Sequence, residues 1–426
     1  MHKLTISSFL VLMGFIPVFA ADWPHWRGPT RNGHTEELSG WNGTKWLLTN
    51  AWKGNFGEGN SAPLEVGGKL FQMGWKGGKD FLYCVDSRNG MILWEQSYKA
   101  PRYGRNASGD QVFFSGPSST PDYDSKTGYL YTLSCDGDLC CWETKNQGKL
   151  LWNKNLHESY KVLVRPKVGR SGQRDYGYTS SPLVLQDRLI VEVGAKEGTL
   201  IAFDLTTGKE LWRSTANEPA GHNGGPVPIT VGNESAIATL THKGVLVVAA
   251  SGNNAGKTIA TWPWETNFSN NIASVTVDKD HLIATSHYNI LRTMSLKITA
   301  RGAEKIWEAP VASKVCSPVI HGEKMYFAWS KLHCLDLRTG KRIWEEQGYH
   351  DQGSCVVTKD NKLIIYSGKG QLTLVDLAGD AAKKCTVLAN RPALFQNDAW
   401  PHVVLSNKKL FCRDRMGNLA AFHVGE

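Results

Sequence analysis

A repeated unit that runs from leucine through aspartate and glycine to tryptophan constrains this chain more than any other feature. Clear copies span residues 82–94, 200–212 and 332–344, and a fourth, with one inserted residue, ends at Trp152. In each copy an apolar strand leads into a polar turn containing Gly, and a second strand carries Trp. Gly accepts a positive φ, and Asp bonds readily to its own backbone in turns. Each copy therefore predicts a β-hairpin with one large aromatic residue at a fixed position.

A second element precedes each hairpin, and it consists of a small or polar residue leading into a short apolar strand. Eight such starts lie at Ser61, Ser119, Ser180, Gly225, Ala273, Cys316, Gly353 and Pro401. One start and one hairpin together supply four strands, which is the content of a β-propeller blade. The sequence therefore predicts an all-β fold, an eight-bladed β-propeller of four-stranded antiparallel blades. Helix content should be very low, because no long segment has a 3.6-residue period.

The last start leaves room for three strands before the C-terminus, at residues 403–405, 410–413 and 419–423. The missing fourth strand must come from elsewhere, and residues 45–52 suit an outer strand. Closure by an N-terminal strand would remove an open sheet edge that invites aggregation. We therefore expect residues 21–59 to form a leader and closing strand, and residues 60–426 to form the blades of a single domain.

Residues 1–20 have the pattern of a secretory signal peptide. Lys3 precedes an apolar run from Leu4 to Ile16, and small residues stand at Val18 and Ala20. The run is too short to cross a bilayer comfortably. We expect cleavage near Ala20 and an exported protein, periplasmic or secreted, with no integral membrane span; the alternative is an N-terminal anchor that is retained.

The charge composition bears on which kind of partner the protein binds. The formal net charge is +9 over 426 residues, and the basic residues are scattered rather than clustered, which gives no reason to expect nucleic-acid binding. The nine cysteines follow no disulfide-scaffold spacing and mostly stand in apolar strands, as small buried hydrophobic residues do. No Cys-x-x-Cys motif is present.

A tryptophan that recurs once in each repeat is best explained as a packing element between neighbouring sheets. We assign this structural role to Trp94, Trp152, Trp212, Trp307 and Trp344.

The unit Asp-x-x-Thr-Gly-Lys-x-x-Trp resembles the repeat of pyrroloquinoline quinone (PQQ)-type β-propellers. The start Asp-Trp-Pro-His-Trp-Arg-Gly-Pro at residues 22–29 also resembles the leader of exported bacterial proteins of this group that are termed BamB-like. The resemblance implies the propeller fold, and the same superfamily includes BamB-like scaffolds and true quinoprotein alcohol dehydrogenases. Fold alone does not decide between these functions.

Adjacent cysteines at Cys140 and Cys141 argue for the dehydrogenases, since methanol-type members of the superfamily carry an adjacent-cysteine disulfide against the cofactor. In this chain the pair lies within a regular strand pattern, where successive side chains point to opposite faces. We therefore do not expect a functional disulfide there.

The blade-to-blade connections should carry any binding specificity, because propeller loops open onto the central funnel. They offer cations, amides and aromatic rings to an anionic or peptide-like partner. The candidate binding residues are Arg102, Arg105, Arg170, Arg174, Tyr176, His222, Asn271, His350, Asp351, Asp398, Trp400 and His402. No catalytic residue and no metal ligand is indicated.

Three functions remain open. The leading hypothesis is a monomeric, BamB-like, non-catalytic binding or scaffold module of the cell envelope, with a protein partner and no cofactor. The alternative is a PQQ- and calcium-dependent quinoprotein alcohol or sugar dehydrogenase, which would require carboxylates to converge around a stacking Trp. A polysaccharide-binding module is a third possibility and would require exposed Trp side chains.

Overall fold

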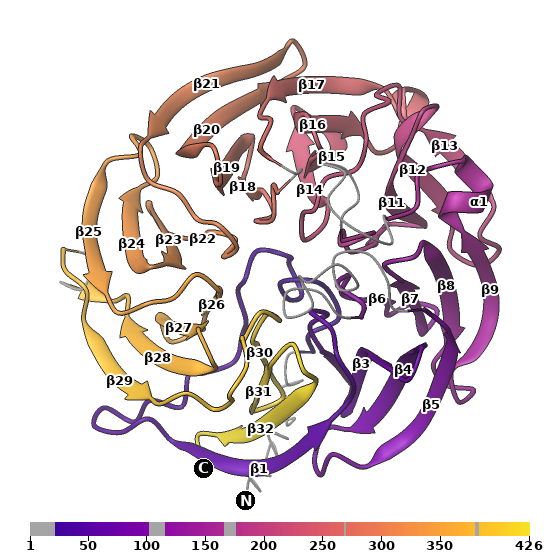
Figure 1. The fold of residues 1–426 in the computed structure, drawn as a ribbon. Coiled ribbons are helices and arrows are strands. Elements are labelled where there is room, and N and C mark those ends of the chain that lie inside the picture. The colour runs from indigo at the N-terminus through magenta and orange to yellow at the C-terminus, as the bar shows by residue number, and fades with distance from the viewer. Residues whose placement is uncertain (1–21, 102–115, 166–175, 268–269, 380–382) are drawn as a thin grey trace, which may run out of the picture.

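The protein is described by a computed structural model that covers residues 22–101, 116–165, 176–267, 270–379 and 383–426. Eight four-stranded antiparallel sheets form a ring (Figure 1). The predicted eight-bladed, all-β propeller is therefore confirmed. Helix in these residues is limited to short segments, such as α1 (Leu156–Tyr160) and a 3-10 turn at Gly252–Asn254. Within the same residues, every helix falls short of the length and apolar character that a membrane span requires.

The strands occupy equivalent places in every blade. The innermost strands are β2 (Leu64–Val66), β6 (Asp122–Asp124), β10 (Leu183–Leu185), β14 (Val227–Val231), β18 (Thr276–Asp278), β22 (Val319–His321), β26 (Gly353–Val357) and β30 (Val404–Ser406). The second strands are β3 (Lys69–Lys76), β7 (Tyr129–Leu133), β11 (Arg188–Ala195), β15 (Glu234–Leu240), β19 (His281–His287), β23 (Lys324–Trp329), β27 (Lys362–Ser367) and β31 (Lys409–Arg413). The third strands are β4 (Lys79–Asp86), β8 (Asp138–Glu143), β12 (Gly198–Asp204), β16 (Gly244–Ala249), β20 (Leu291–Thr299), β24 (Lys331–Asp336), β28 (Gln371–Asp376) and β32 (Asn418–Val424). The outer strands are β5 (Ile92–Lys99), β9 (Lys149–Asn155), β13 (Glu210–Arg213), β17 (Thr258–Pro263), β21 (Gly302–Ala309), β25 (Arg342–Gln347), β29 (Val387–Arg391) and β1 (Leu48–Asn55). We number the blades 1 to 8 from β2–β5 to the blade made of β30, β31, β32 and β1.

Blade 8 joins the two ends of the described chain. Strand β1 pairs antiparallel with β32, from Leu48 opposite Val424 to Asn55 opposite Asn418. The predicted closure by an N-terminal strand is confirmed, although the strand begins and ends three residues later than the segment 45–52 indicated.

The core lies between blades, and alternate residues of one strand serve different neighbours. In β12, Ile201 and Phe203 belong to the cluster shared with blade 2, whereas Leu200 and Ala202 belong to the cluster shared with blade 4. Because both sheet faces are covered, the middle strands are buried along almost their whole length. In β8, Cys140 likewise packs toward blade 1, while its neighbour Cys141 packs toward blade 3.

The repeated tryptophans lie on the outer strands, against the next blade. The Trp152 indole N–H donates to the Leu205 carbonyl at 3.1 Å, and that of Trp307 donates to the Leu337 carbonyl at 2.9 Å. Trp94 packs against Gly148 and Trp212 packs close to Gly256, while Trp344 is buried beside Tyr326 of its own blade. Trp52 of β1 makes the same contact at the ring closure, donating to the Ser87 carbonyl at 2.9 Å.

The leader, residues 22–47, crosses the middle of the ring (indigo in Figure 1). Trp23 bridges to Glu65 of β2 in blade 1, and His34 bridges to Val357 of β26 in blade 7. Asp122 of β6 accepts hydrogen bonds from His25 and Arg31 at 2.7 and 2.6 Å. The innermost strands therefore surround a segment of the chain itself.

Candidate functional site

A cavity of about 390 Å³ lies at the centre of the ring and is lined mainly by the blade-to-blade connections. Its aromatic side chains are Trp26, Tyr176, His222, Tyr288, Trp400 and His402, and its amide side chains are Asn60, Asn223, Asn270 and Gln352. Because Trp26 comes from the leader, the leader supplies part of the cavity wall. Cavities of this size accept small molecules or a few side chains of a partner.

The aromatic rings at the leader side are held by one another. Trp26 meets His402 edge-on, with ring centroids 5.3 Å apart, and donates its indole N–H to the Ser274 hydroxyl at 3.0 Å. Tyr176 and His222 form a second edge-on pair at 5.2 Å. Such contacts fix the orientation of the aromatic side chains that line the cavity.

Burial determines the charge state of His402. Removal from water, helped by the Arg27 charge, lowers its pKa to about 3 in spite of a hydrogen bond to the Val403 carbonyl. The imidazole is therefore neutral at ordinary pH, and it contributes an aromatic surface rather than a cation.

The charged side chains at the cavity occur as ion pairs. Lys314 lies 3.5 Å from Asp351, and Arg415 lies 3.4 Å from Asp398. Each cation also covers an aromatic ring, Lys314 over Tyr288 and Arg415 over Trp400. Pairing of this kind makes the described wall nearly neutral and suits an uncharged polar ligand.

Two amide oxygens at the cavity have no hydrogen-bond donor among the described residues. They are Oδ1 of Asn60 and Oδ1 of Asn270, and the Asn270 side chain is buried. A buried acceptor without a donor is costly, and because both oxygens are almost inaccessible, a ligand or water can donate to them only after the side chains turn toward the cavity.

Glu192 of β11 stands behind the wall, in contact with Asn223. Its carboxylate accepts from the Gly221 amide, the Asn223 side chain, Thr239 and Ser180 at 2.8 to 3.2 Å. Complete burial raises its pKa, although all four donors act in the opposite direction. These bonds occupy the carboxylate, which positions Asn223 rather than facing the cavity.

The structure places the residues predicted from sequence at several distances from the cavity. Tyr176, His222, Asp351, Trp400 and His402 line it. Asn271 lies behind the wall, where its amide donates to the Thr241 and Trp264 carbonyls, and Asp398 reaches the cavity only through Arg415. His350 is exposed and packs beside Gly368. Arg102, Arg105, Arg170 and Arg174 lie outside the described residues.

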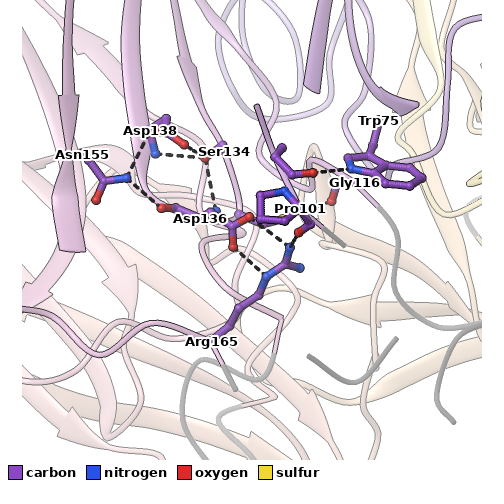
Figure 2. A network of polar contacts seen from close by, with 10 residues as sticks. Trp75, Pro101, Gly116, Ser134, Asp136, Asp138, Asn155 and Arg165 are labelled. Carbon is purple, nitrogen blue, oxygen red and sulfur yellow. Dashed lines mark hydrogen bonds and ion pairs between the residues drawn. The ribbon is translucent and has the colours of Figure 1, made fainter. Parts of the chain in front are cut away.

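A polar network holds Pro101, which follows β5 of blade 1, and Arg165, which follows α1 (Figure 2). The Arg165 guanidinium donates to both oxygens of Asp136, at 2.7 and 3.1 Å, and to the Pro101 carbonyl at 3.5 Å. Asn155 donates to the Asp136 carbonyl and to Asp138. The Arg165 side chain therefore joins the chain that follows β5 to the turn between β7 and β8.

Sequence reasoning missed Trp26, Tyr288, Lys314 and Arg415 at the cavity. Trp26 stands in the leader motif, which we used only as evidence of a family resemblance and not as evidence of a binding site. Arg415 lies in a turn between two strands of one blade, outside the connections in which we searched.

The described residues do not fit the calcium ion of a quinoprotein site. Calcium takes about six to eight oxygen ligands, several of them carboxylates. Asp351 is the carboxylate that lines the cavity in the described ranges, and it is paired with Lys314. Within those ranges, no group of three His, Cys, Asp or Glu side chains is arranged to hold a metal.

The fold and the cavity define a class: an eight-bladed β-propeller with a ligand-sized chamber at its centre. The chain belongs to the family described as outer membrane protein assembly factor BamB, whose model matches residues 78–346. The match includes the clear repeats from residues 82 to 344, which confirms the resemblance seen in the sequence.

A curated relative is the dehydrogenase subunit of the quinone-dependent alcohol dehydrogenase from Komagataeibacter europaeus. It is 26% identical over 169 residues, which are 37% of this chain and 20% of the relative. This chain therefore matches only a fifth of that protein's length.

Two solved structures show the same fold at low sequence identity. BamB from Moraxella catarrhalis has a TM-score of 0.60 and 11% identity, and the match covers 88% of this chain and all of that protein. Quinohemoprotein alcohol dehydrogenase from Comamonas testosteroni has a TM-score of 0.64 and 14% identity, with 95% of this chain and 80% of that protein covered. These likenesses establish architecture and leave function to the site.

Proposed function

We propose that this protein is an exported, monomeric, non-catalytic binding module of the cell envelope that holds a protein partner at the cavity face. The observation that carries the proposal is the pairing of the polar groups on the cavity wall. Among the described residues, Lys314 and Arg415 are already paired with carboxylates, whereas the amide oxygens of Asn60 and Asn270 have no donor. A partner loop with hydroxyl or amide donors satisfies those oxygens when the two side chains turn toward the cavity.

Site-specific photo-crosslinking tests this function. A photoreactive residue replaces Gln352 on the cavity wall or, as the control, Leu93 on outer strand β5, which is 44% exposed. We expect a discrete crosslinked protein from position 352 in the envelope of the source cell, and none from position 93. The second change Trp400→Ala should weaken the product, because it removes an aromatic contact at the cavity.

Equal products from both positions would place the partner on the outer rim and contradict the proposal. Persistence of the product with Trp400→Ala, together with its loss when an oligosaccharide is added, would favour a carbohydrate ligand instead.

A quinoprotein dehydrogenase is the second candidate, and the quinone-dependent alcohol dehydrogenases among the curated relatives favour it. Titration calorimetry with PQQ and Ca²⁺, followed by dye reduction with alcohols and sugars, tests it. Saturable calcium-dependent binding with turnover would replace the binding-module proposal. The absence of any binding heat at tens of micromolar PQQ would support the binding-module proposal.

A further inference from the structure

Two cysteines from neighbouring blades meet behind the cavity wall. The Sγ atoms of Cys316 and Cys355 lie 3.6 Å apart, although the residues are 39 positions apart in the sequence. Each is only 1% exposed. Cys316 leads into β22 of blade 6, and Cys355 stands in β26 of blade 7.

The other cysteines are differently placed. Cys140 and Cys141 belong to separate interblade cores. Across the described ranges, which contain all nine cysteines, Cys316 and Cys355 form the one sulfur-to-sulfur hydrogen bond. Chance burial of a hydrophobic thiol does not require such a contact.

The pKa values of the two thiols shift in opposite directions. The hydrogen bond from Cys355 lowers the pKa of Cys316 in spite of its burial, and a backbone hydrogen bond at Ala328 and the Arg27 charge act in the same direction. The same bond and burial raise the pKa of Cys355. The Arg27 guanidinium belongs to the leader and is held by the Pro318 carbonyl and the Thr276 hydroxyl. The Arg27 charge acts to lower the pKa of both thiols, and a nearby cation favours the thiolate, which is the reactive form.

We propose that Cys316 and Cys355 form a disulfide that links blade 6 to blade 7 behind the cavity wall. The oxidant is a small-molecule or protein disulfide. The Cys316 thiolate attacks one sulfur of that disulfide and releases the first thiol, and Cys355 then attacks Cys316 and releases the second. The two protein thiols together lose two protons and two electrons, and the oxidant is reduced to two thiols.

The bond would tie together two parts of the cavity wall. Ser317 and Ser354 both line the cavity, and each stands next to one of the cysteines. The Ser317 hydroxyl accepts from the Ser274 amide at 2.9 Å, and the Ser354 hydroxyl accepts from the Val403 amide at 3.0 Å. The inference stands apart from the proposed partner, because it needs only the two sulfurs and an oxidant.

Mapping of the full-length protein tests the proposal. The protein is refolded in a buffer of oxidised and reduced glutathione, alkylated, and digested with trypsin without reduction. Cys316 and Cys355 fall in different tryptic peptides, residues 315–324 and 343–359, and each is the single cysteine of its peptide. We expect these two peptides to be joined, with a mass lower than their sum by two hydrogens, and seven of the nine cysteines to be alkylated.

Variants provide the matched controls. Cys316→Ala and Cys355→Ala should each abolish the linked peptide, whereas Cys412→Ala, which removes another fully buried cysteine, should keep it. Oxidation should raise the Tm of the wild type and of Cys412→Ala only. Recovery of both peptides alkylated and unlinked under oxidising conditions, or linked to other cysteines, would overturn the proposal without affecting the partner hypothesis.

Discussion

Asp122 ties the leader to the ring. It is fully buried on β6 and accepts from Arg31, His25 and the Val184 amide. Burial alone would raise the pKa of Asp122, but Arg31 and His25 outweigh burial and hold it below its usual value. The leader is therefore held in the channel by a buried charge pair as well as by apolar packing.

Asp122→Asn should lower the free energy of unfolding by about 3–5 kcal/mol, because it leaves the buried Arg31 charge without its partner. Asp187→Asn is the control, since Asp187 pairs with Arg188 at a similar distance but is 75% exposed. The control should change stability by less than about 1 kcal/mol. Urea unfolding measures both, and equal effects would show that the Asp122 pair does not hold the leader.

His402 makes stability depend on pH. Its pKa in the fold is about 3, below the ordinary 6.5, so the unfolded chain binds a proton more readily than the folded one. Its contribution is complete above pH 6.5 and is lost as the pH falls toward 3, by at most about 1.4 kcal/mol per pH unit. His402→Asn, which keeps a donor for Val403, should have a flatter Tm profile between pH 7 and 4. Parallel profiles would show that His402 is not protected from protonation.

At the scale of the element, each repeat has two structural roles: it forms a turn, and it provides the surface on which a tryptophan of the previous blade packs. In the turn after β24, Asp336 accepts from the Thr339 amide at 2.8 Å and the Thr339 hydroxyl at 2.7 Å. Gly340 follows with a φ of +67°, and a Cβ there would lie 2.3 Å from the Trp307 ring. Asp and Thr shape the turn, while Gly leaves room for the tryptophan of the previous blade.

Gly340→Ala should therefore destabilise the protein more than Gly322→Ala. Gly322 has a similar φ of +59°, but a Cβ there would meet nothing within 4 Å. The shared backbone strain costs roughly 1 kcal/mol, and the clash with Trp307 should add about 1–3 kcal/mol at Gly340 alone. Thermal unfolding of the two variants measures the difference, and equal losses would contradict the docking role of the glycine.

At the scale of the molecule, the N-terminal residues close the ring and also fill it. Strand β1 covers the edge of β32, and the leader crosses the middle of the ring (Figure 1). Two shortened chains separate these roles. A chain beginning at Gly40 should stay monomeric with a reduced Tm, because it keeps β1 and loses the contacts of Asp122.

A chain beginning at Phe56 should also lose β1 and expose β32 as an edge, and should therefore self-associate. Light scattering after gel filtration distinguishes the two chains. A monomeric second chain would show that the ring does not depend on strand closure.

The eight blades, the four strands in each and the closing strand could all be predicted from the sequence alone. Those features depend on turn chemistry and two-residue alternation within short segments, together with the need to pair the last blade. Tertiary structure decided the cavity, the entry of Trp26 into its wall and the meeting of Cys316 with Cys355. Each of these depends on where the ring brings distant connections and the leader together, and no local pattern encodes that distance.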